Sequence, residues 1–371
     1  MSPVEQTTSP APVGEASPGF PRNDWILDTG GRILVTGAGG FIGERLVRWL
    51  VDCGFRHIRC LVRSGDKAKE LRSALGRAGN DGLEVVEGNL LSRDDCRRAA
   101  EGVSVIYHLV AGRGKSFAEC FLNSVVTTRN LLDAALAGPG LKRFVNVSSM
   151  AVYSNEKLRR GGLLDETCEV EARLDLRFDA YAYGKAKQDE IVFEYARTRG
   201  LPFVILRPGV VLGPGNVKIP GRVGIDTFGV FLHLGLGNRL PVTYVDNCAE
   251  ALALAGLKKG IAGEVINIMD DDLPSSREFL RLYKRQVMRF VSIPVPYRVF
   301  LCFCFLWERY AEWSEGQLPP ILNRKECATY WKGNRYSNRK AKELLGWQPK
   351  VPMSECLQAY FDYSREMRNK P

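Results

Sequence analysis

The stretch V-T-G-A-G-G-F-I-G-E-R, residues 35–45, decides the fold of this chain. Residues 32–35, which lead into it, are mostly apolar and typical of a short strand. Residues 44–53, which follow it, carry apolar side chains at the spacing of an amphipathic helix. The glycines between the two runs indicate a strand that turns tightly into a helix.

Three glycines in this turn, Gly37, Gly40 and Gly43, follow one another at intervals of three residues. Because they lack a Cβ, they let the backbone turn sharply and approach a ligand closely. Unpaired N–H groups at a helix start, with the positive end of the helix dipole, favour a pyrophosphate. The pattern predicts a dinucleotide site and hydride-transfer chemistry. An ordinary strand-to-helix turn is the alternative, since the commoner spacing is G-x-G-x-x-G.

Apolar strand-like runs then alternate with helical patterns, for instance a helical stretch at 124–137. The runs are residues 58–62, 83–86, 103–109, 144–147 and 203–206. This alternation predicts an α/β fold, a Rossmann-type doubly wound parallel sheet with helices on both faces. In such sheets, ligands bind beyond the carboxyl ends of the strands.

The composition changes along the chain predict three regions. Residues 1–24 are rich in Pro, Ser, Thr and Glu and are expected to form a disordered tail. Residues 25–207 form the dinucleotide-binding domain. Residues 208–371, where the alternation loosens, form mainly a smaller mixed substrate-binding lobe, with segments that return to the core.

The overall composition limits the class of protein. The 371 residues include ten scattered cysteines without a C-x-x-C pair and three histidines, which indicates reduced thiols, a cytoplasmic location and no metal site. The net charge of +10 is spread along the chain and fits nucleotides, a membrane surface or an ordinary solvated surface equally well. No motif indicates nucleic-acid binding. The longest apolar run, near 299–307, is shorter than the roughly 18–20 residues of a membrane span.

A second motif, D-A-Y-A-Y-G-K-A-K at residues 179–187, indicates proton transfer. Tyr181 and Lys185 are four residues apart and so share one helical face. An ammonium group and an oxidised nicotinamide ring both favour the phenolate form of a tyrosine, so Tyr181 would exchange a proton with an alcohol or a ketone. Ser149, which follows the run at 144–147, would hydrogen-bond the same oxygen.

Tyr183 and Lys187 offer a second register on the same helix. Two residues turn a helix by roughly 200°, so the two pairs cannot both face one site. We favour Tyr181 and Lys185. An isolated Y-x-x-x-K is often an ordinary helix surface, but here it accompanies the glycine turn and Ser149.

With these motifs, the chain resembles the extended short-chain dehydrogenase/reductases of the NAD(P)-dependent epimerase/dehydratase family, over about residues 32–362. The motifs that carry the resemblance are T-G-A-G-G-F-I-G (36–43), G-N-L (88–90), H-L-V-A (108–111), V-S-S-M-A-V-Y (147–153), L-R-P-G-V-V-L-G-P-G (206–215), Y-V-D-N (244–247) and L-G-W-Q-P (345–349).

The resemblance implies roles for individual residues. The catalytic residues would be Ser149, Tyr181 and Lys185. The cofactor would be bound by Tyr181 and Lys185 together with Gly37, Gly40, Phe41, Ile42, Gly43, Arg63, Asn89, Leu90 and Ala111. Asn89 stands where the family usually has Asp. Asn123 matches a family asparagine, with a helix-packing side chain as the alternative.

The end of the run at 58–62 bears on the choice of cofactor. An NAD-preferring enzyme typically has an acid here, which holds the ribose 2′-hydroxyl. This chain has Val62 followed by Arg63, and an arginine pairs with a 2′-phosphate. We therefore expect NADP rather than NAD, unless Arg63 merely stacks on the adenine.

Three branches of the family differ at informative positions. The 4,6-dehydratases carry an Asp-Glu pair where this chain has Met150 and Ala151, which argues against dehydration. Arg239 resembles the phosphate-binding arginine of nucleotide-sugar epimerases, but residues 331–336 lack their R-P-G-D-like stretch, and a surface loop explains Arg239 equally well. The apolar, aromatic segment at 291–313 resembles the 3β-hydroxysteroid dehydrogenase-like branch. It would line a pocket, touch a membrane peripherally or form a core helix.

The sequence therefore predicts an NAD(P)-dependent oxidoreductase that interconverts a secondary alcohol and a ketone. The substrate would be a hydrophobic alcohol or ketone. The alternatives are a nucleotide-sugar epimerase with tightly bound NAD, and an inactive dinucleotide-binding sensor or scaffold. A homodimer is left open.

Overall fold

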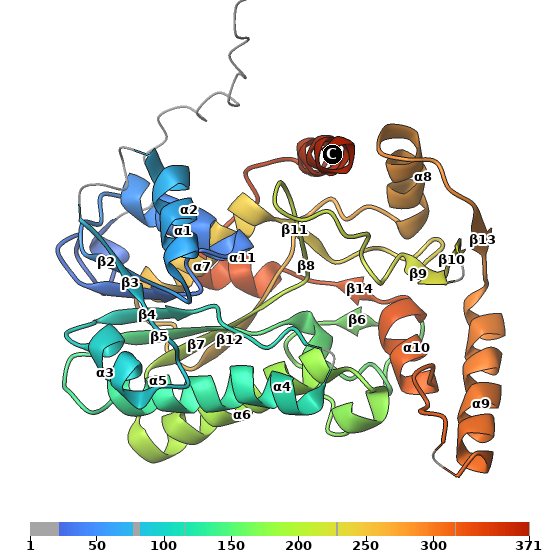
Figure 1. Ribbon diagram of the computed structural model, residues 1–371, viewed down its shortest axis with the longest axis horizontal. Helices are drawn as coiled ribbons and strands as arrows, with labels where there is room; N and C mark the ends of the chain where they lie inside the picture. The colour runs from blue at the N-terminus through green and yellow to red at the C-terminus, as the bar shows by residue number, and fades with distance from the viewer. Residues whose placement is uncertain (1–21, 77–81, 115, 228, 316, 371) are drawn as a thin grey trace, which may run out of the picture.

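The computed structural model describes residues 22–76, 82–114, 116–227, 229–315 and 317–370 (Figure 1). Its centre is a seven-stranded parallel sheet in the order β12-β7-β5-β4-β1-β2-β3. The strands are β1 (Ile33–Thr36), β2 (Ile58–Val62), β3 (Leu83–Glu87), β4 (Val105–His108), β5 (Arg143–Val147), β7 (Phe203–Pro208) and β12 (Glu264–Ile268). The six strands predicted from the sequence are confirmed, and β12 is an addition that the sequence interpretation missed.

Helices cover both faces of this sheet, as the doubly wound prediction requires (Figure 1). One face packs against α1 (Phe41–Asp52), α2 (Gly65–Leu75), α7 (Val245–Leu257) and α11 (Arg339–Leu345). The other packs against α3 (Arg93–Ala100), α5 (Thr127–Ala135) and α6 (Ala180–Arg199). Consecutive residues of β1 illustrate the pattern: Ile33 and Val35 join one core, and Leu34 joins the other.

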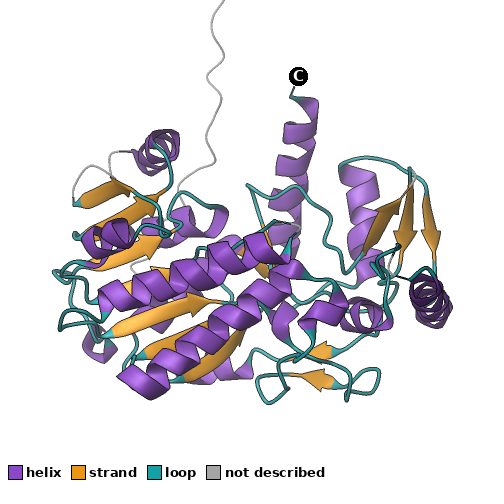
Figure 2. Ribbon diagram, turned by 60° about the horizontal axis from the view of Figure 1, so that its bottom comes forward, coloured by secondary structure: helices purple, strands orange, loops and turns teal. Residues whose placement is uncertain are grey.

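The remaining elements lie beside the sheet, on the right of Figure 1. The strands are β9 (Gly224–Thr227), β10 (Val230–His233) and β13 (Ser292–Pro294), with the pairs β8 (Val210–Leu212)–β11 (Val242–Tyr244) and β6 (Leu163–Leu164)–β14 (Arg335–Tyr336). The helices are α8 (Ser276–Gln286), α9 (Tyr297–Trp313), α10 (Arg324–Trp331) and α12 (Met353–Asn369). In Figure 2, α12 projects from the body and carries the C-terminus. Three segments from beyond residue 207, α7, β12 and α11, return to the central sheet.

Two predicted boundaries differ from the structure. The helix expected at 44–53 begins at Phe41, because Gly40 already occupies the position before its first turn. The helical stretch at 124–137 is divided into a π-helical turn (Leu122–Val126) and α5. Of the expected tail, residues 1–21 lie outside the described residues, and a 3₁₀ helix (Arg22–Asp24) follows them.

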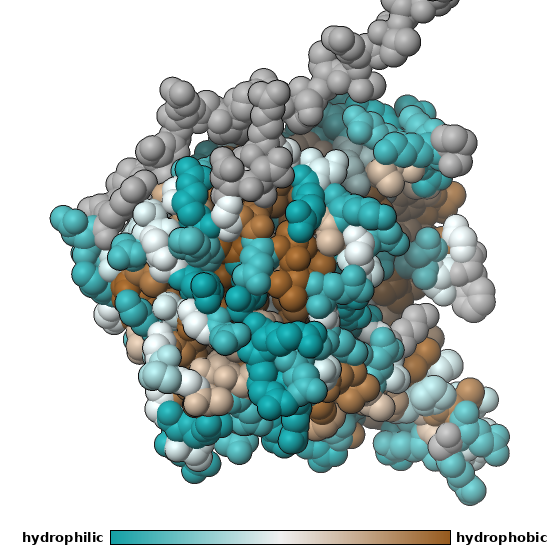
Figure 3. Space-filling model, turned by 60° about the vertical axis from the view of Figure 1, so that its left-hand side comes forward, coloured by the Kyte–Doolittle hydropathy of each residue, from teal (hydrophilic) through white to brown (hydrophobic). Residues whose placement is uncertain are grey.

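No helix in the described part of the chain is long and apolar enough to cross a bilayer. The face in Figure 3 shows apolar side chains in patches that hydrophilic side chains interrupt.

Asn247 joins two of the sequence motifs in the core. Its amide nitrogen donates to Asp270 at 3.0 Å and to the carbonyl of Val351 at 3.1 Å. Its amide oxygen accepts from the backbone N–H groups of Lys350 and Val351, and its own carbonyl accepts from the Trp347 indole at 3.0 Å. The side chain therefore fastens the C-terminal segment to α7.

We predict that Asn247→Ala lowers the free energy of unfolding by at least about 2 kcal/mol, because a buried group left without its partner costs about 1–3 kcal/mol. Urea denaturation measures the effect. The exposed Asn369 provides the control, since Asn369→Ala should change stability by less than about 0.5 kcal/mol. Equal stability of the two variants would contradict this role for Asn247.

Candidate active site

The glycine turn has the geometry that the sequence requires. Gly37 has a φ of +72°, a conformation that favours glycine, and its carbonyl accepts from Gly40 N at 3.0 Å. A Cβ on Gly43 would lie 2.2 Å from the Gly37 oxygen, so only glycine lets α1 approach β1 this closely. Gly40 precedes α1 without a side-chain cap, which leaves the first N–H groups of the helix for a pyrophosphate.

A cavity of about 260 Å³ opens beside this turn and fits the cofactor prediction. Its walls come from the glycine turn and from the segments that follow β2, β3 and β4. The predicted residues that line it are Gly37, Gly40, Phe41, Arg63, Asn89, Leu90 and Ala111. Ile42 instead packs against the core, and Gly43 acts through the close approach of helix and strand.

Two cations close to each other in the sequence line this cavity. Arg63 is exposed directly after β2, and Lys67 lies in the first turn of α2. Ser64 caps α2 by accepting from Lys67 N. A helix start flanked by two cations is suited to a phosphate.

Ser149, Tyr181 and Lys185 meet where β5 and α6 adjoin, although none of them lines the cavity. Lys185 is buried, and its ammonium group donates to the Val147 carbonyl and, at 3.0 Å, to Gln188. Burial lowers the pKa of Lys185 to about 7, with Asp189 opposing the shift. Burial also raises the pKa of Tyr181, while Arg113 and a hydrogen bond with Ser149 hold the rise back.

The alternative register makes other contacts. The Tyr183 ring packs edge-on against Phe117, with 5.2 Å between the ring centroids, and Lys187 donates to Glu190 at 2.7 Å. Of the two tyrosines, Tyr181 is therefore the one beside Ser149.

A buried polar network behind Lys185 escaped the sequence interpretation. Gln188 donates to Thr128 at 2.8 Å, and His108 lies between Thr128 at 2.9 Å and Thr36 at 2.8 Å. Burial lowers the pKa of His108 to about 3, so its ring is neutral at pH 7. The network fixes the amide that holds Lys185. In the sequence, Gln188, three residues after Lys185 on the same helix, was the signal that could have revealed this network.

Asp189 anchors the same part of α6 to the sheet. It accepts from Ser148 at 2.8 Å, from Asn146 at 2.8 Å and from Arg207 at 3.0 Å, and all of these groups are buried. Arg207 belongs to the L-R-P motif, which therefore has a structural role here.

Two other expected residues have local partners. Asn123 lines the cavity, and its amide donates to the Glu119 carbonyl at 3.0 Å. Arg239 is exposed and donates to the Leu273 carbonyl at 2.7 Å. Arg113, which the sequence interpretation missed, lines the cavity and has no hydrogen bond or ion pair within the described ranges.

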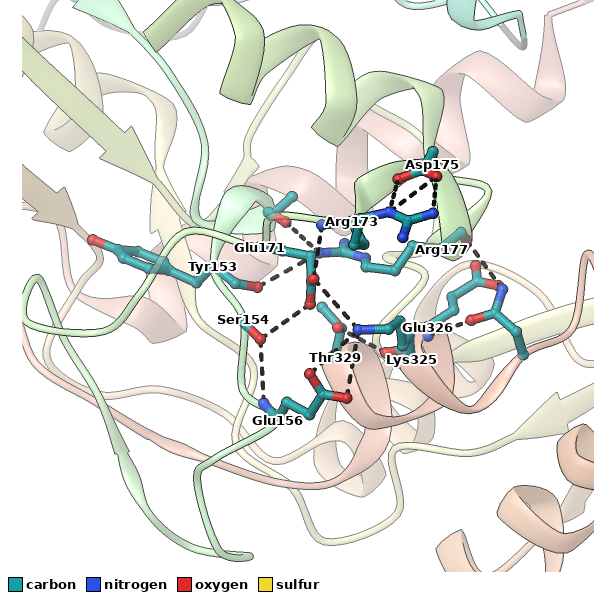
Figure 4. Close-up of polar contacts among 12 residues, drawn as sticks. Tyr153, Ser154, Glu156, Glu171, Arg173, Asp175, Arg177, Lys325, Glu326 and Thr329 are labelled. Atoms are coloured by element: carbon teal, nitrogen blue, oxygen red, sulfur yellow. Dashed lines mark hydrogen bonds and ion pairs between the residues drawn. The ribbon is translucent and has the colours of Figure 1, made fainter. Parts of the chain in front are cut away.

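A charged cluster ties α10 to the segment after Ser149 (Figure 4). Lys325 lies between Glu156, at 3.2 Å, and Glu171, at 3.4 Å. The fully buried Arg177 donates to the Ala151 carbonyl at 2.9 Å and to Asp179 at 3.0 Å. A second cavity, of about 690 Å³, lies between this cluster and α9.

Comparison with known proteins agrees with this architecture. A "3 beta-hydroxysteroid dehydrogenase/Delta 5-->4-isomerase" of Mycobacterium tuberculosis is 27% identical over 365 residues, covering 92% of this chain and 93% of the relative. A 2-alkyl-3-oxoalkanoate reductase of Stenotrophomonas maltophilia is 28% identical and covers 88% and 97%. The solved structure of a UDP-glucuronic acid 4-epimerase from Bacillus cereus with NAD has a TM-score of 0.67 at 24% identity, covering 91% and 99%, which supports the fold.

The model of the NAD dependent epimerase/dehydratase family matches residues 33–268, well over half of the chain. The relatives include dehydrogenases and reductases of the extended short-chain type. By this match, the chain belongs to the NAD-dependent epimerase/dehydratase family.

Proposed function

We propose that this protein is an NAD(P)-dependent dehydrogenase or reductase that interconverts a secondary alcohol and a ketone. The observation that carries the proposal is that Ser149, Tyr181 and Lys185 gather at the carboxyl end of β5, the same edge of the parallel sheet at which β1 runs into the glycine turn. An inactive sensor would not need a buried ammonium group at this place. The free cysteines suit a reducing compartment, and we propose the cytoplasm.

The side chains divide the chemistry among themselves. Bound NAD(P) supplies or accepts the hydride. Tyr181 gives a proton to the ketone oxygen, or takes one from the alcohol, and Ser149 holds that oxygen by a hydrogen bond. The ammonium group of Lys185 favours the phenolate of Tyr181, and Lys185 would also reach the nicotinamide ribose of the bound cofactor.

Of the two cofactors, NADP is the better fit to the chain. Arg63 and Lys67 both line the cavity near the start of α2, and Lys67 also pairs with the exposed Glu70. The 2′-hydroxyl of NAD is uncharged and does not account for two cations at this place. No acid that could hold this hydroxyl is among the described residues that line the cavity. A 2′-phosphate pairs with both.

Nucleotide-sugar epimerisation is the second candidate, because solved structures of this fold include UDP-glucuronic acid 4-epimerases. Such a substrate needs cations for its diphosphate. Arg239 already donates to Leu273 O, and the buried Arg222 donates to Thr329 O and to the Tyr336 hydroxyl. These contacts favour the dehydrogenase.

The outer face of α9 supports peripheral contact with a lipid surface. Val299, Phe303, Leu306, Tyr310 and Trp313 lie on one helical face and are all exposed, Trp313 to 77%. Apolar and aromatic side chains at this spacing suit the boundary between lipid headgroups and acyl chains. The positive net charge of the chain would add attraction to anionic lipids.

We predict that Tyr181→Phe lowers turnover by about 10²- to 10⁴-fold, because it removes the group that transfers the proton. NADPH affinity, measured by fluorescence titration, should stay nearly unchanged. Tyr183→Phe is the matched control and should keep most of the activity. Full turnover of Tyr181→Phe would remove this residue from the mechanism.

The cofactor proposal predicts that Arg63→Asp reverses the preference from NADPH to NADH, since an acid repels the 2′-phosphate and binds the 2′-hydroxyl. Dissociation constants for both cofactors give the ratio. Arg129→Gln, at an exposed position outside the cavity, should leave the ratio as it is. If Arg63→Asp left the ratio of NADPH to NADH dissociation constants unchanged, Arg63 would not bind the 2′-phosphate.

For the lipid contact, sedimentation with vesicles that contain phosphatidylserine is the measurement. The wild-type protein should bind, and the double variant Leu306→Glu/Trp313→Glu should lose most of the binding while it keeps its turnover. Val217→Glu, an exposed apolar residue away from α9, should bind like the wild type. Equal sedimentation of all three proteins would exclude this face.

A further inference from the structure

Arg113 is a solvent-exposed cation in the wall of the cofactor cavity that the proposed mechanism does not use. It has no hydrogen bond or ion pair with any residue for which the structure gives a position. The nearby carboxylate of Glu119 lies against the backbone of Gly114 and makes no ion pair with the guanidinium. A guanidinium in a site generally pairs with an anion, most favourably in a bidentate way.

The backbone on both sides of Arg113 is held in place. Gly112 N donates to the Ser124 hydroxyl at 3.0 Å, and a Cβ on Gly112 would lie 2.5 Å from the Cα of Cys120. The Cys120 thiol donates to the Gly114 carbonyl at 3.3 Å. The backbone that carries Arg113 is therefore fixed to α4 (Phe117–Phe121) and to the π-helical turn after it.

Cys120 and Ser124 also lie against α6, the helix that carries Tyr181 and Lys185. A Cβ on Gly184 would lie 3.1 Å from the Cys120 carbonyl and 3.1 Å from the Ser124 hydroxyl. The segment of Arg113 and the Tyr181–Lys185 face of α6 thus meet through Cys120 and Ser124. The charge of Arg113 reaches both groups, since it lowers the pKa of Tyr181 and that of Lys185.

We propose that Arg113 binds a carboxylate that the substrate carries close to its reacting alcohol or ketone carbon. This inference rests on the proposed function, because Tyr181 marks the position of the reacting oxygen. A carboxylate matches the planar guanidinium and is compact enough to stand beside that oxygen. The pyrophosphate of the cofactor has its own place at the start of α1, between Gly37 and Phe41. The substrate class is accordingly an oxo or hydroxy acid with an apolar remainder.

The test compares two probes of equal size, octanoate and octanamide, on the protein saturated with NADPH. Isothermal titration calorimetry gives their affinities for the wild type, Arg113→Gln and Arg113→Lys. We expect the wild type to prefer octanoate, Arg113→Gln to lose at least about 10-fold in octanoate affinity, and Arg113→Lys to recover part of it. Octanamide should bind all three proteins alike. The exposed Arg129 supplies the control variant Arg129→Gln, which should match the wild type.

Three results would overturn the proposal. The first is that the wild type binds neither probe, and the second is that it binds octanamide as tightly as octanoate. The third is that Arg113→Gln keeps the wild-type preference for octanoate. A loss of NADPH affinity in Arg113→Gln, with the probe preference intact, would place Arg113 on the cofactor instead. None of these results affects the comparison of Tyr181→Phe with Tyr183→Phe, so the proposed function stands or falls separately.

Discussion

The burial of the Lys185 ammonium group is the constraint on which the site depends. Water cannot solvate this group, so the protein provides the Val147 carbonyl and the Gln188 amide oxygen in its place, with Asp189 nearby. Two of these partners are fixed by the sheet, since Val147 ends β5 and Asp189 is bound to Arg207 of β7. Gln188 is held by Thr128 and by the Val110 carbonyl. The polar contacts that satisfy Lys185 therefore also set the position of α6.

That position has consequences on both sides of the helix. Toward the cofactor cavity, α6 approaches Cys120 and Ser124 so closely that a Cβ on Gly184 would lie only 3.1 Å from each of them. Toward the smaller lobe, Asp179 at the start of α6 accepts from Arg177 and from the Tyr330 hydroxyl of α10. A hydrogen bond from Tyr330 therefore joins α10 to the start of α6, and the ion pair of Asp179 with the preceding Arg177 stands beside it.

Much of the fold could be predicted because it follows from local patterns. The six predicted strands are short apolar runs between helical patterns. The glycine turn has a backbone conformation that favours glycine at Gly37 and a close approach that only glycine permits at Gly43. The strand β12 escaped prediction because only pairing with β7, about sixty residues earlier in the chain, makes it a strand. The early start of α1 also follows from tertiary geometry, since Gly40 serves as its cap.

The proximity of Tyr181 to Ser149 could be predicted because chemistry and spacing coincide there, and the catalytic role of Tyr181 and Lys185 stays a prediction. Spacing alone left Tyr183 and Lys187 open, and their contacts with Phe117 and Glu190 became visible only in three dimensions. Arg113 could not be found from the sequence, because its place in the cavity wall depends on the contact of its segment with α4.

The most direct test of hydride transfer to an external substrate is the cofactor content of the purified protein. Mass spectrometry of the small molecules released on denaturation measures it. A dehydrogenase exchanges its cofactor in every cycle, so we expect little retained nucleotide and reversible binding of added NADPH. Stoichiometric NAD that persists through purification would contradict the account, since an epimerase returns the hydride that it takes and keeps its cofactor.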